Sequence, residues 1–104
     1  METTEAKKIA KLNDAFRKSG QGITVTTGVQ ALEDLIGLVD EIRRFKDFNE
    51  DNDPYQEHDF GTVYWFGQKV FWKIDYYNPE LSGWRDPLDP SCNRVLTIML
   101  AEEY

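Results

Sequence analysis

Hydrophobic residues along this chain recur first at helical spacing and then at strand spacing. The first group lies at intervals of three and four residues: Ile9, Leu12, Ala15 and Phe16. This interval is typical of an amphipathic helix, and the "GQG" that follows predicts its end near Ser19. A second group predicts another helix, ending near Lys46: Leu32, Leu35, Ile36, Val39 and Ile42. Thr27 and Gln30 have the spacing of a capping box at its start.

Strand-like segments make up most of the remaining chain. Residues 23–27 ("ITVTT") alternate and are β-branched, and residues 94–101 ("RVLTIMLA") form a short apolar run. Residues 58–66 and 69–77 predict a hairpin with a Gly67-Gln68 turn, which places Phe66 opposite Lys69 and His58 opposite Tyr77. Residues 78–93 hold three prolines and predict a long loop. The order α-β-α-β-β-β predicts an α+β fold: a mainly antiparallel sheet of about four strands with two helices on one face.

Length and composition indicate one globular domain over residues 1–104, with 40% hydrophobic residues. The opening "METTEAKK" lacks the apolar segment of a signal peptide, and no apolar run reaches membrane-spanning length. Cys92 is the one cysteine of the sequence, so no internal disulfide can form. We therefore expect a cytoplasmic protein.

The predicted hairpin gives the two faces of the sheet different characters. One face is apolar, and we expect the helices to pack on it: Val63, Trp65, Val70, Trp72 and Ile74. The other face mixes rings with polar groups: His58, Phe60, Thr62, Tyr64, Phe66, Lys69, Phe71, Lys73, Asp75 and Tyr77. Such a face suits a partner-binding platform or a homodimer interface, and a second, partly covered core layer is the alternative.

Charge is distributed unevenly along the chain. Residues 1–46 carry eight basic and seven acidic side chains, whereas residues 47–104 carry four and twelve. The negative half argues against direct contact with nucleic acid or an anionic membrane, and favours a cation or a basic protein surface. Its densest part is residues 47–59, called here the acidic loop, with six acids in thirteen residues.

His58, the only histidine of the sequence, is a catalytic candidate. In a strand, its neighbours Glu57 and Asp59 point to the opposite face, so the better constellation is His58 with Asp75 and Tyr77 across the hairpin. No nucleophile motif accompanies these residues. A hydrogen-bonded histidine at a strand edge is the alternative, and we expect no enzymatic activity.

The acidic loop begins with a pattern related to calcium loops, D-x-N-x-D-N, from Asp47, Asn49, Asp51 and Asn52. The twelfth position is His58 instead of a bidentate glutamate, so Asp53 or Glu57 would have to supply the missing oxygens. The alternative is a solvated loop of Asx turns. We expect no cofactor, with calcium as the open alternative.

Several segments resemble a bacterial family known as domain of unknown function 3768: "NDPYQEHDFG", "FWKIDYY", "VLTIMLAEEY" and "IAKLNDAFR". The resemblance runs from Ile9 to Tyr104 and implies no activity, cofactor or catalytic residue. It implies a small accessory protein of bacteria, with plasmids and other mobile elements as a common setting. That setting, taken with the acidic surface, favours an inhibitor of nucleic-acid-binding defence proteins, of the anti-CRISPR or anti-restriction type.

The leading hypothesis is therefore a non-enzymatic module that binds a basic protein surface. A calcium- or small-ligand-binding domain is the second hypothesis, and an enzyme that uses His58 and Asp75 is the third. The residues expected to contact the partner come from the acidic loop and the mixed sheet face: Glu50, Asp51, Asp53, Glu57, His58, Asp59, Phe60, Tyr64, Phe71, Lys73, Asp75 and Tyr77.

Overall fold

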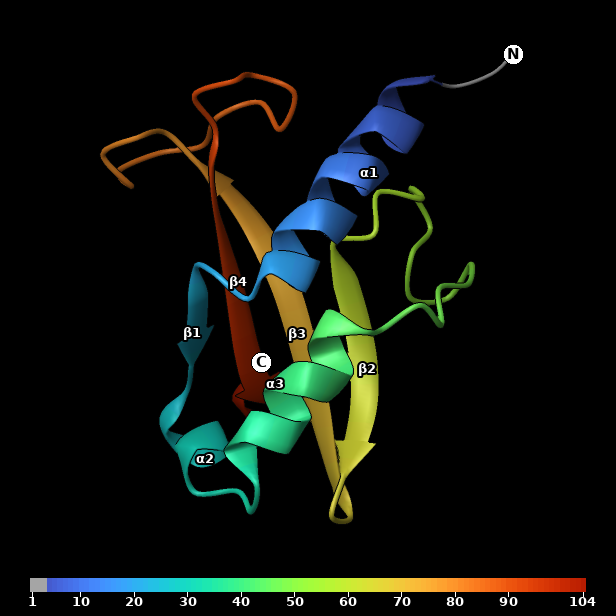
Figure 1. Ribbon diagram of the computed structural model, residues 1–104, viewed down its shortest axis with the longest axis vertical. Helices are drawn as coiled ribbons and strands as arrows, with labels where there is room; N and C mark the ends of the chain where they lie inside the picture. The colour runs from blue at the N-terminus through green and yellow to red at the C-terminus, as the bar shows by residue number, and fades with distance from the viewer. Residues whose placement is uncertain (1–3) are drawn as a thin grey trace.

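A computed structural model describes residues 4–104, which form a four-stranded sheet with helices on one side (Figure 1). The helices are α1 (Thr4–Ser19), α2 (Thr27–Gln30) and α3 (Leu35–Arg43), with a final 3₁₀ turn η1 (Ala101–Glu103). The strands are β1 (Ile23–Val25), β2 (Phe60–Trp65), β3 (Gln68–Tyr77) and β4 (Asn93–Leu100). Within these residues, no helix combines the length and apolar character needed to cross a membrane.

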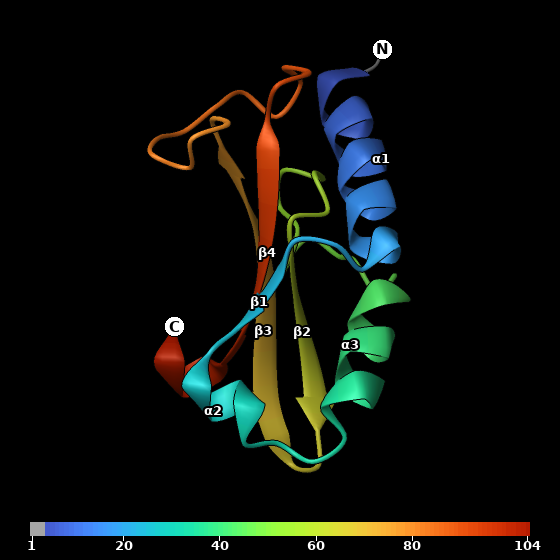
Figure 2. The same cartoon turned by 60° about the vertical axis from the view of Figure 1, so that its left-hand side comes forward.

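The sheet is mixed, with strand order β1-β4-β3-β2. β2, β3 and β4 pair antiparallel, whereas β1 runs parallel to β4. Figures 1 and 2 show α1 and α3 against one side of the sheet, here called the helix face, and residues 78–92 and η1 on the opposite side, the outer face. The predicted α+β class is confirmed, and the parallel β1 is the departure from a mainly antiparallel sheet.

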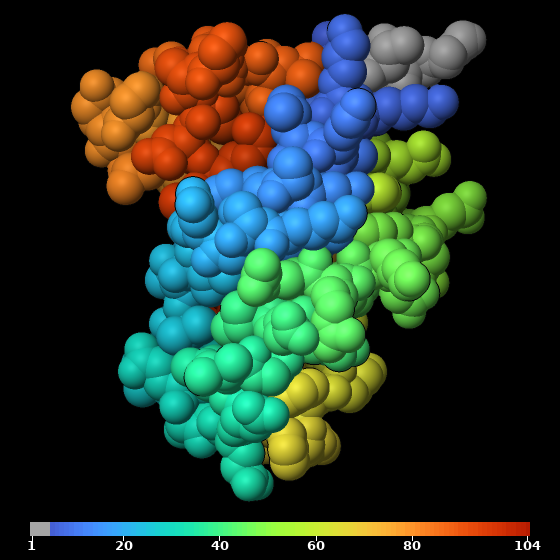
Figure 3. Space-filling model, viewed as in Figure 1, coloured from blue at the N-terminus to red at the C-terminus, as the bar shows by residue number. Residues whose placement is uncertain are grey.

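The core lies between the helix face and the two long helices. Figure 3 shows α1, α3 and the following loop covering this side of the molecule, with the β2–β3 turn emerging below them. Fully buried apolar side chains come from both layers: Val29, Leu38, Ile42, Val70, Trp72, Leu96 and Ile98. The strand residues in this group all have even numbers, as expected for side chains that alternate between faces.

The second predicted helix is divided into α2 and α3. Asp34 lies between them in the left-handed region (φ 51°), and its carboxylate accepts a hydrogen bond from the Gly37 amide at the start of α3. The predicted capping residue is wrong by one position, because the Thr26 hydroxyl accepts from Val29. The carboxylate of Glu103, from the far end of the chain, accepts from the Gly28 amide. A distant residue thus satisfies an amide that local capping leaves free.

The hairpin register differs from the prediction by two residues, which leaves the faces unchanged. Trp65 pairs with Gln68, and the turn is Phe66-Gly67 with φ values of 49° and 81°. Positive φ at both positions is a type I′ turn, which accepts glycine at its second position. The register also places Gly61 opposite Trp72, where any Cβ would meet the indole ring. Only glycine leaves room for this tryptophan.

α1 is rotated about its axis relative to the predicted apolar stripe. Leu12, expected to face the core, is 44% exposed, while Asn13 and Arg17 are fully or almost fully buried beside Ile9. The helix therefore presents two polar side chains, four residues apart, to the interior.

Candidate functional site

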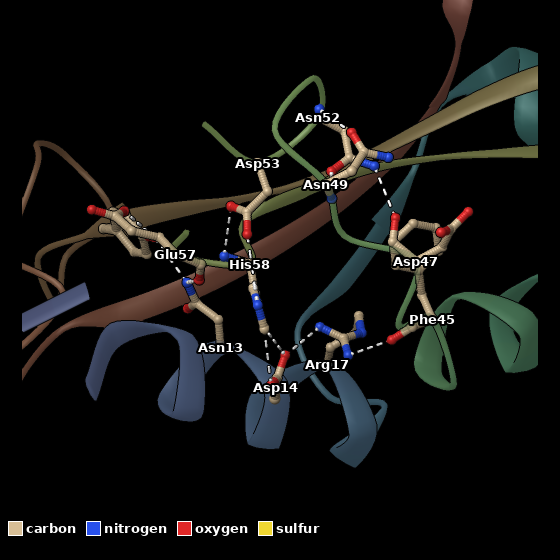
Figure 4. Close-up of polar contacts among 11 residues, drawn as sticks. Asn13, Asp14, Arg17, Phe45, Asp47, Asn49, Asn52, Asp53, Glu57 and His58 are labelled. Carbon is tan, nitrogen blue, oxygen red and sulfur yellow. Dashed lines mark hydrogen bonds and ion pairs between the residues drawn. The ribbon is translucent and has the colours of Figure 1, made fainter. Parts of the chain in front are cut away.

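The acidic loop is closed by its own asparagine side chains. The side-chain oxygen of Asn49 accepts hydrogen bonds from the amides of Asp51 and Asn52, at 2.8 and 3.1 Å. Asn52 in turn accepts from the Asn49 amide and donates to the carbonyl of Asp47 (Figure 4). These contacts are Asx turns, so the loop has the conformation expected of the alternative to a calcium cage.

Two of the four metal candidates already accept hydrogen bonds within the protein. Asn49 uses its side-chain oxygen for backbone amides, and Asp53 is 95% buried with one carboxylate oxygen bonded to the His58 amide at 3.0 Å. Asp47 and Asp51 are exposed. Over residues 4–104, no group of three or more acidic, histidine or cysteine side chains is placed to hold a metal ion. The D-x-N-x-D-N pattern here builds a turn.

His58 faces α1 and not the outer face. Its Nδ1 lies 3.0 Å from Asp14 Oδ1, and its Nε2 lies 3.6 Å from Asp53 Oδ2. The ring stacks on Phe48, with ring centroids 3.9 Å apart and an angle of 2° between the planes. The predicted cluster of His58 with Asp75 and Tyr77 is wrong, because β2 begins only at Phe60 and the backbone at His58 turns away with φ 58°. Both ring nitrogens are directed at carboxylates, so this geometry orients the imidazole without supplying a nucleophile.

Arg17 connects this histidine to the core. Its guanidinium donates to Asp14 at 3.0 Å and to the Phe45 carbonyl at 2.8 Å (Figure 4). It lies over the rings of Phe48 and Trp72, about 5.4 and 5.3 Å from their centroids, which is a cation–π arrangement. Asp14 therefore receives hydrogen bonds from both Arg17 and His58, and this network fixes the acidic loop to α1.

A second polar group adjoins it at the end of the hairpin. The side-chain amide of Asn13 donates to the Glu57 carbonyl and to the Tyr76 hydroxyl, both at 2.9 Å. The Tyr76 hydroxyl lies 3.3 Å from a carboxylate oxygen of Glu57 and 3.4 Å from one of Asp59. Burial, and then the neighbouring carboxylates, raise the pKa of both acids above their usual values of 4.5 and 3.8.

Three residues of α1 belong to this network and were not predicted from the sequence. These residues are Asn13, Asp14 and Arg17, which lie 41 to 45 positions before His58 in the sequence. A polar pair at i and i+4 beside Ile9 is the one local signal for a polar face turned inward. Nothing near those residues indicates that His58 is their partner.

The outer face carries a separate cluster of aromatic rings. Phe60 and Phe71 lie 5.2 Å apart, and Tyr104 packs edge-on against both from the C-terminus. Beside them Lys73 and Asp75 form an ion pair at 2.9 Å. Tyr104 thus covers part of this face, as expected of the core-layer alternative.

A hollow of about 1070 Å³ lies at the edge of the sheet beside β2 and is called here the edge hollow. It is lined by rings of the outer face, including Tyr64, and by Asp47 and Asp51 of the acidic loop. Tyr64 is 71% exposed. Another hollow, of about 700 Å³, lies between α1 and the acidic loop and includes Lys7, Asp14 and His58.

The expected partner-binding residues therefore fall into four groups. Glu50 and Asp51 are exposed on the acidic loop, whereas Asp53 and His58 are turned inward to α1. Glu57 and Asp59 lie between the two, beside Tyr76. The remaining residues belong to the outer face: Phe60, Tyr64, Phe71, Lys73, Asp75 and Tyr77.

No curated protein and no solved structure matches the chain. A family model described as protein of unknown function (DUF3768) matches residues 25–103 of the 104. The match begins at Val25 and not at Ile9, so it covers the acidic loop and strands β2 to β4 but only the last residue of β1. It does not include α1 with Asn13, Asp14 and Arg17. Because this match spans most of the sequence, the chain belongs to the DUF3768 family.

Proposed function

We propose that this protein acts by binding a basic protein surface through the acidic loop and the adjoining aromatic residues. The edge hollow supports this proposal, because exposed carboxylates and an exposed tyrosine line the same depression. Asp47, Glu50 and Asp51 are exposed, and none forms an ion pair with another residue of the described range 4–104. They are thus available to cations of a partner.

Charge and rings have different roles in such an interface. Unpaired carboxylates attract a basic surface over a distance of about 8 Å at physiological salt and increase the association rate. Aromatic side chains such as Tyr64 contribute most of the affinity once water is excluded. The partner class that fits is a nucleic-acid-binding protein, whose basic surface evolved for phosphates. We extend the proposal to a stoichiometric inhibitor of such a protein, of the anti-CRISPR or anti-restriction type.

Asp53 and Glu57 are unsuitable for testing the charge, because they belong to the network under α1 and beside Tyr76. The test variant is Asp47→Lys, Glu50→Lys and Asp51→Lys, all exposed. The matched control reverses three exposed acids outside the loop: Glu33, Glu80 and Glu102. Both variants change the net charge equally.

Immobilised wild type and both variants are incubated with a lysate of the source cells, and the captured proteins are identified. Association rates of each captured protein are then measured at several salt concentrations. We expect the loop variant to associate at least about tenfold more slowly, with a flatter salt dependence, while the control changes little. If the association rate falls equally in both variants, the effect comes from net charge and not from the position of the acids. If it falls in neither variant, the acidic loop is not part of the interface.

A further inference from the structure

β2 is an edge strand whose outer side has no partner within residues 4–104. The two-residue turn Phe66-Gly67 determines which backbone groups are free. Residues that flank such a turn exchange both backbone hydrogen bonds, so Trp65, Val63 and Gly61 direct their amides and carbonyls at β3. The intervening residues Thr62 and Tyr64 therefore direct theirs away from the sheet.

This edge lacks the features that usually prevent pairing with another strand. Phe60–Trp65 has no charged residue and no proline, and it is six residues long. The other edge strand, β1, has only three residues. Short strands are one of the natural protections, so β1 is protected by its length and β2 is not.

The edge hollow lies beside the free side of β2. Its lining includes Phe60, Thr62 and Tyr64 of the strand, and Asp47 and Asp51 of the acidic loop. A strand added there would place alternate side chains toward the aromatic outer face and toward α3 and the loop. Complementary side chains are therefore apolar at one set of positions and basic at the other.

The charges around the hollow favour a basic partner segment over a second copy of this chain. Glu41 and Arg44 are in contact with each other, and Lys69 lies over the ring of Phe71. The whole lining holds three acids and three bases, but Lys69 lies on the outer face. On the side of α3 and the acidic loop, Asp47 and Asp51 therefore outnumber Lys46 once Glu41 and Arg44 are paired. A second copy would bring another net charge of −7, with the repulsion that this causes.

We propose that an extended segment of the partner, with alternating basic and apolar residues, adds to the sheet as a fifth strand along β2. This mode rests on the proposed function and specifies how the partner is held. Main-chain hydrogen bonds to Thr62 and Tyr64 supply affinity, and the alternating side chains supply selectivity.

The probe is a ten-residue peptide of alternating lysine and valine with blocked ends. Its control has the same sequence with alternate amides N-methylated, which keeps the charge and removes the donors that pair with β2. Binding of both peptides to the full chain is measured by fluorescence anisotropy. We expect the control peptide to bind at least about tenfold more weakly. Each factor of ten corresponds to about 1.4 kcal/mol of binding free energy.

Variants of Thr62 locate the peptide. Thr62→Pro removes an amide that faces away from β3, and we expect at least about a tenfold loss of affinity. Thr62→Ala keeps the amide and should bind as the wild type does. Hydrogen exchange of the free protein should be faster at the amides of Thr62 and Tyr64 than at those of Gly61 and Val63, and the peptide should slow exchange at the first pair.

Each contrary result has a definite meaning. No binding of the probe, or equal binding of its methylated control, overturns strand addition, and slower association of the loop-reversal variant would still support the acidic surface. If the peptide binds as expected but the loop-reversal variant associates with its partner as fast as the wild type, strand addition stands. Only the role of the loop's charge is then wrong. If sedimentation of the protein without peptide shows a dimer that Thr62→Pro dissociates, the edge belongs to a second copy and the proposal is wrong.

Discussion

Tyr76 and Tyr64 come from the two strands of one hairpin, yet their surroundings differ. Tyr76 lies under α1 with its hydroxyl among Asn13, Glu57 and Asp59, and Tyr64 lies 71% exposed at the edge hollow. The helix face thus holds a network of polar side chains bonded to each other, in which Arg17 Nε and Trp72 Nε1 are the atoms without a partner in residues 4–104. The outer edge instead leaves the Tyr64 side chain exposed. Bonded groups contribute to the fold, and the exposed side chain is available to a partner.

The largest expected effect is at the centre of the paired region. Arg17→Ala removes a guanidinium that holds Asp14 and fills the space between Phe48 and Trp72. We expect a loss on the order of 3 kcal/mol in the free energy of unfolding, measured by urea denaturation.

Two further substitutions separate packing from charge at this position. Arg17→Met keeps an unbranched chain against the rings and should cost less than alanine. Lys18→Ala, at the exposed neighbouring position, should change stability by less than about 0.5 kcal/mol. Equal losses for Arg17→Ala and Lys18→Ala would contradict a central role for the buried guanidinium.

The next effect concerns the close approach of the two hairpin strands. A Cβ at Gly61 would meet the indole of Trp72, so Gly61→Ala should cost about 2 kcal/mol through overpacking. At Gly83 the nearest atom to an added Cβ is 3.5 Å away, so Gly83→Ala should be nearly neutral. Thermal melts of the two variants test this difference. Equal melting temperatures would contradict the close approach of Gly61 to Trp72.

The same substitution on the two tyrosines tests the contrast directly. Tyr76→Phe leaves the side-chain amide of Asn13 without one of its acceptors and should cost about 1 kcal/mol. Tyr64→Phe removes an exposed hydroxyl and should leave the free energy of unfolding unchanged. A measurable loss in the free energy of unfolding for Tyr64→Phe would mean that the Tyr64 hydroxyl contributes to the fold, contrary to its exposed position.

Patterns within one element predicted the fold well. Alternation along residues 60–77 assigns Val70, Trp72 and Ile74 to the helix face even though the register is displaced, because a shift of two residues preserves the alternation. The end of the first helix at Ser19 follows from an equally local signal. So does the last strand, predicted over residues 94–101 and observed at Asn93–Leu100.

Contacts between distant segments could not be predicted in the same way. His58 was assigned to a strand by its neighbours, and only the position of Asp14 on α1 shows where its ring is held. The division of the second helix depends on Asp34 in the left-handed region, and the amide of Gly28 is satisfied by Glu103 from the opposite end of the chain. Hydrogen bonds between distant segments decided the positions of His58 and of the Gly28 amide, and the left-handed cap at Asp34 decided the division of the helix.

The smallest expected effect is a gain in stability on removing the charge of Glu57 or Asp59, which lie beside Tyr76. The folded protein raises the pKa of Glu57 and Asp59, chiefly by burial, so it binds protons more strongly than the unfolded chain does. Stability therefore falls as pH rises through the raised pKa values, and the cost of the charges is absent below the usual values of 4.5 and 3.8. Glu57→Gln and Asp59→Asn should each stabilise the protein at pH 7, by less than about 1 kcal/mol because solvent screens both groups.

The melting temperature of each variant is compared with that of the wild type from pH 7 down to pH 3. The difference should disappear as the wild-type carboxylates become protonated. Glu80→Gln, at an exposed position, is the matched control and should follow the wild type throughout. A gain that is constant with pH would contradict burial of the charge as its cause. If instead both variants melt below the wild type at pH 7, the two carboxylates stabilise the fold through their hydrogen bonds with the Tyr76 hydroxyl.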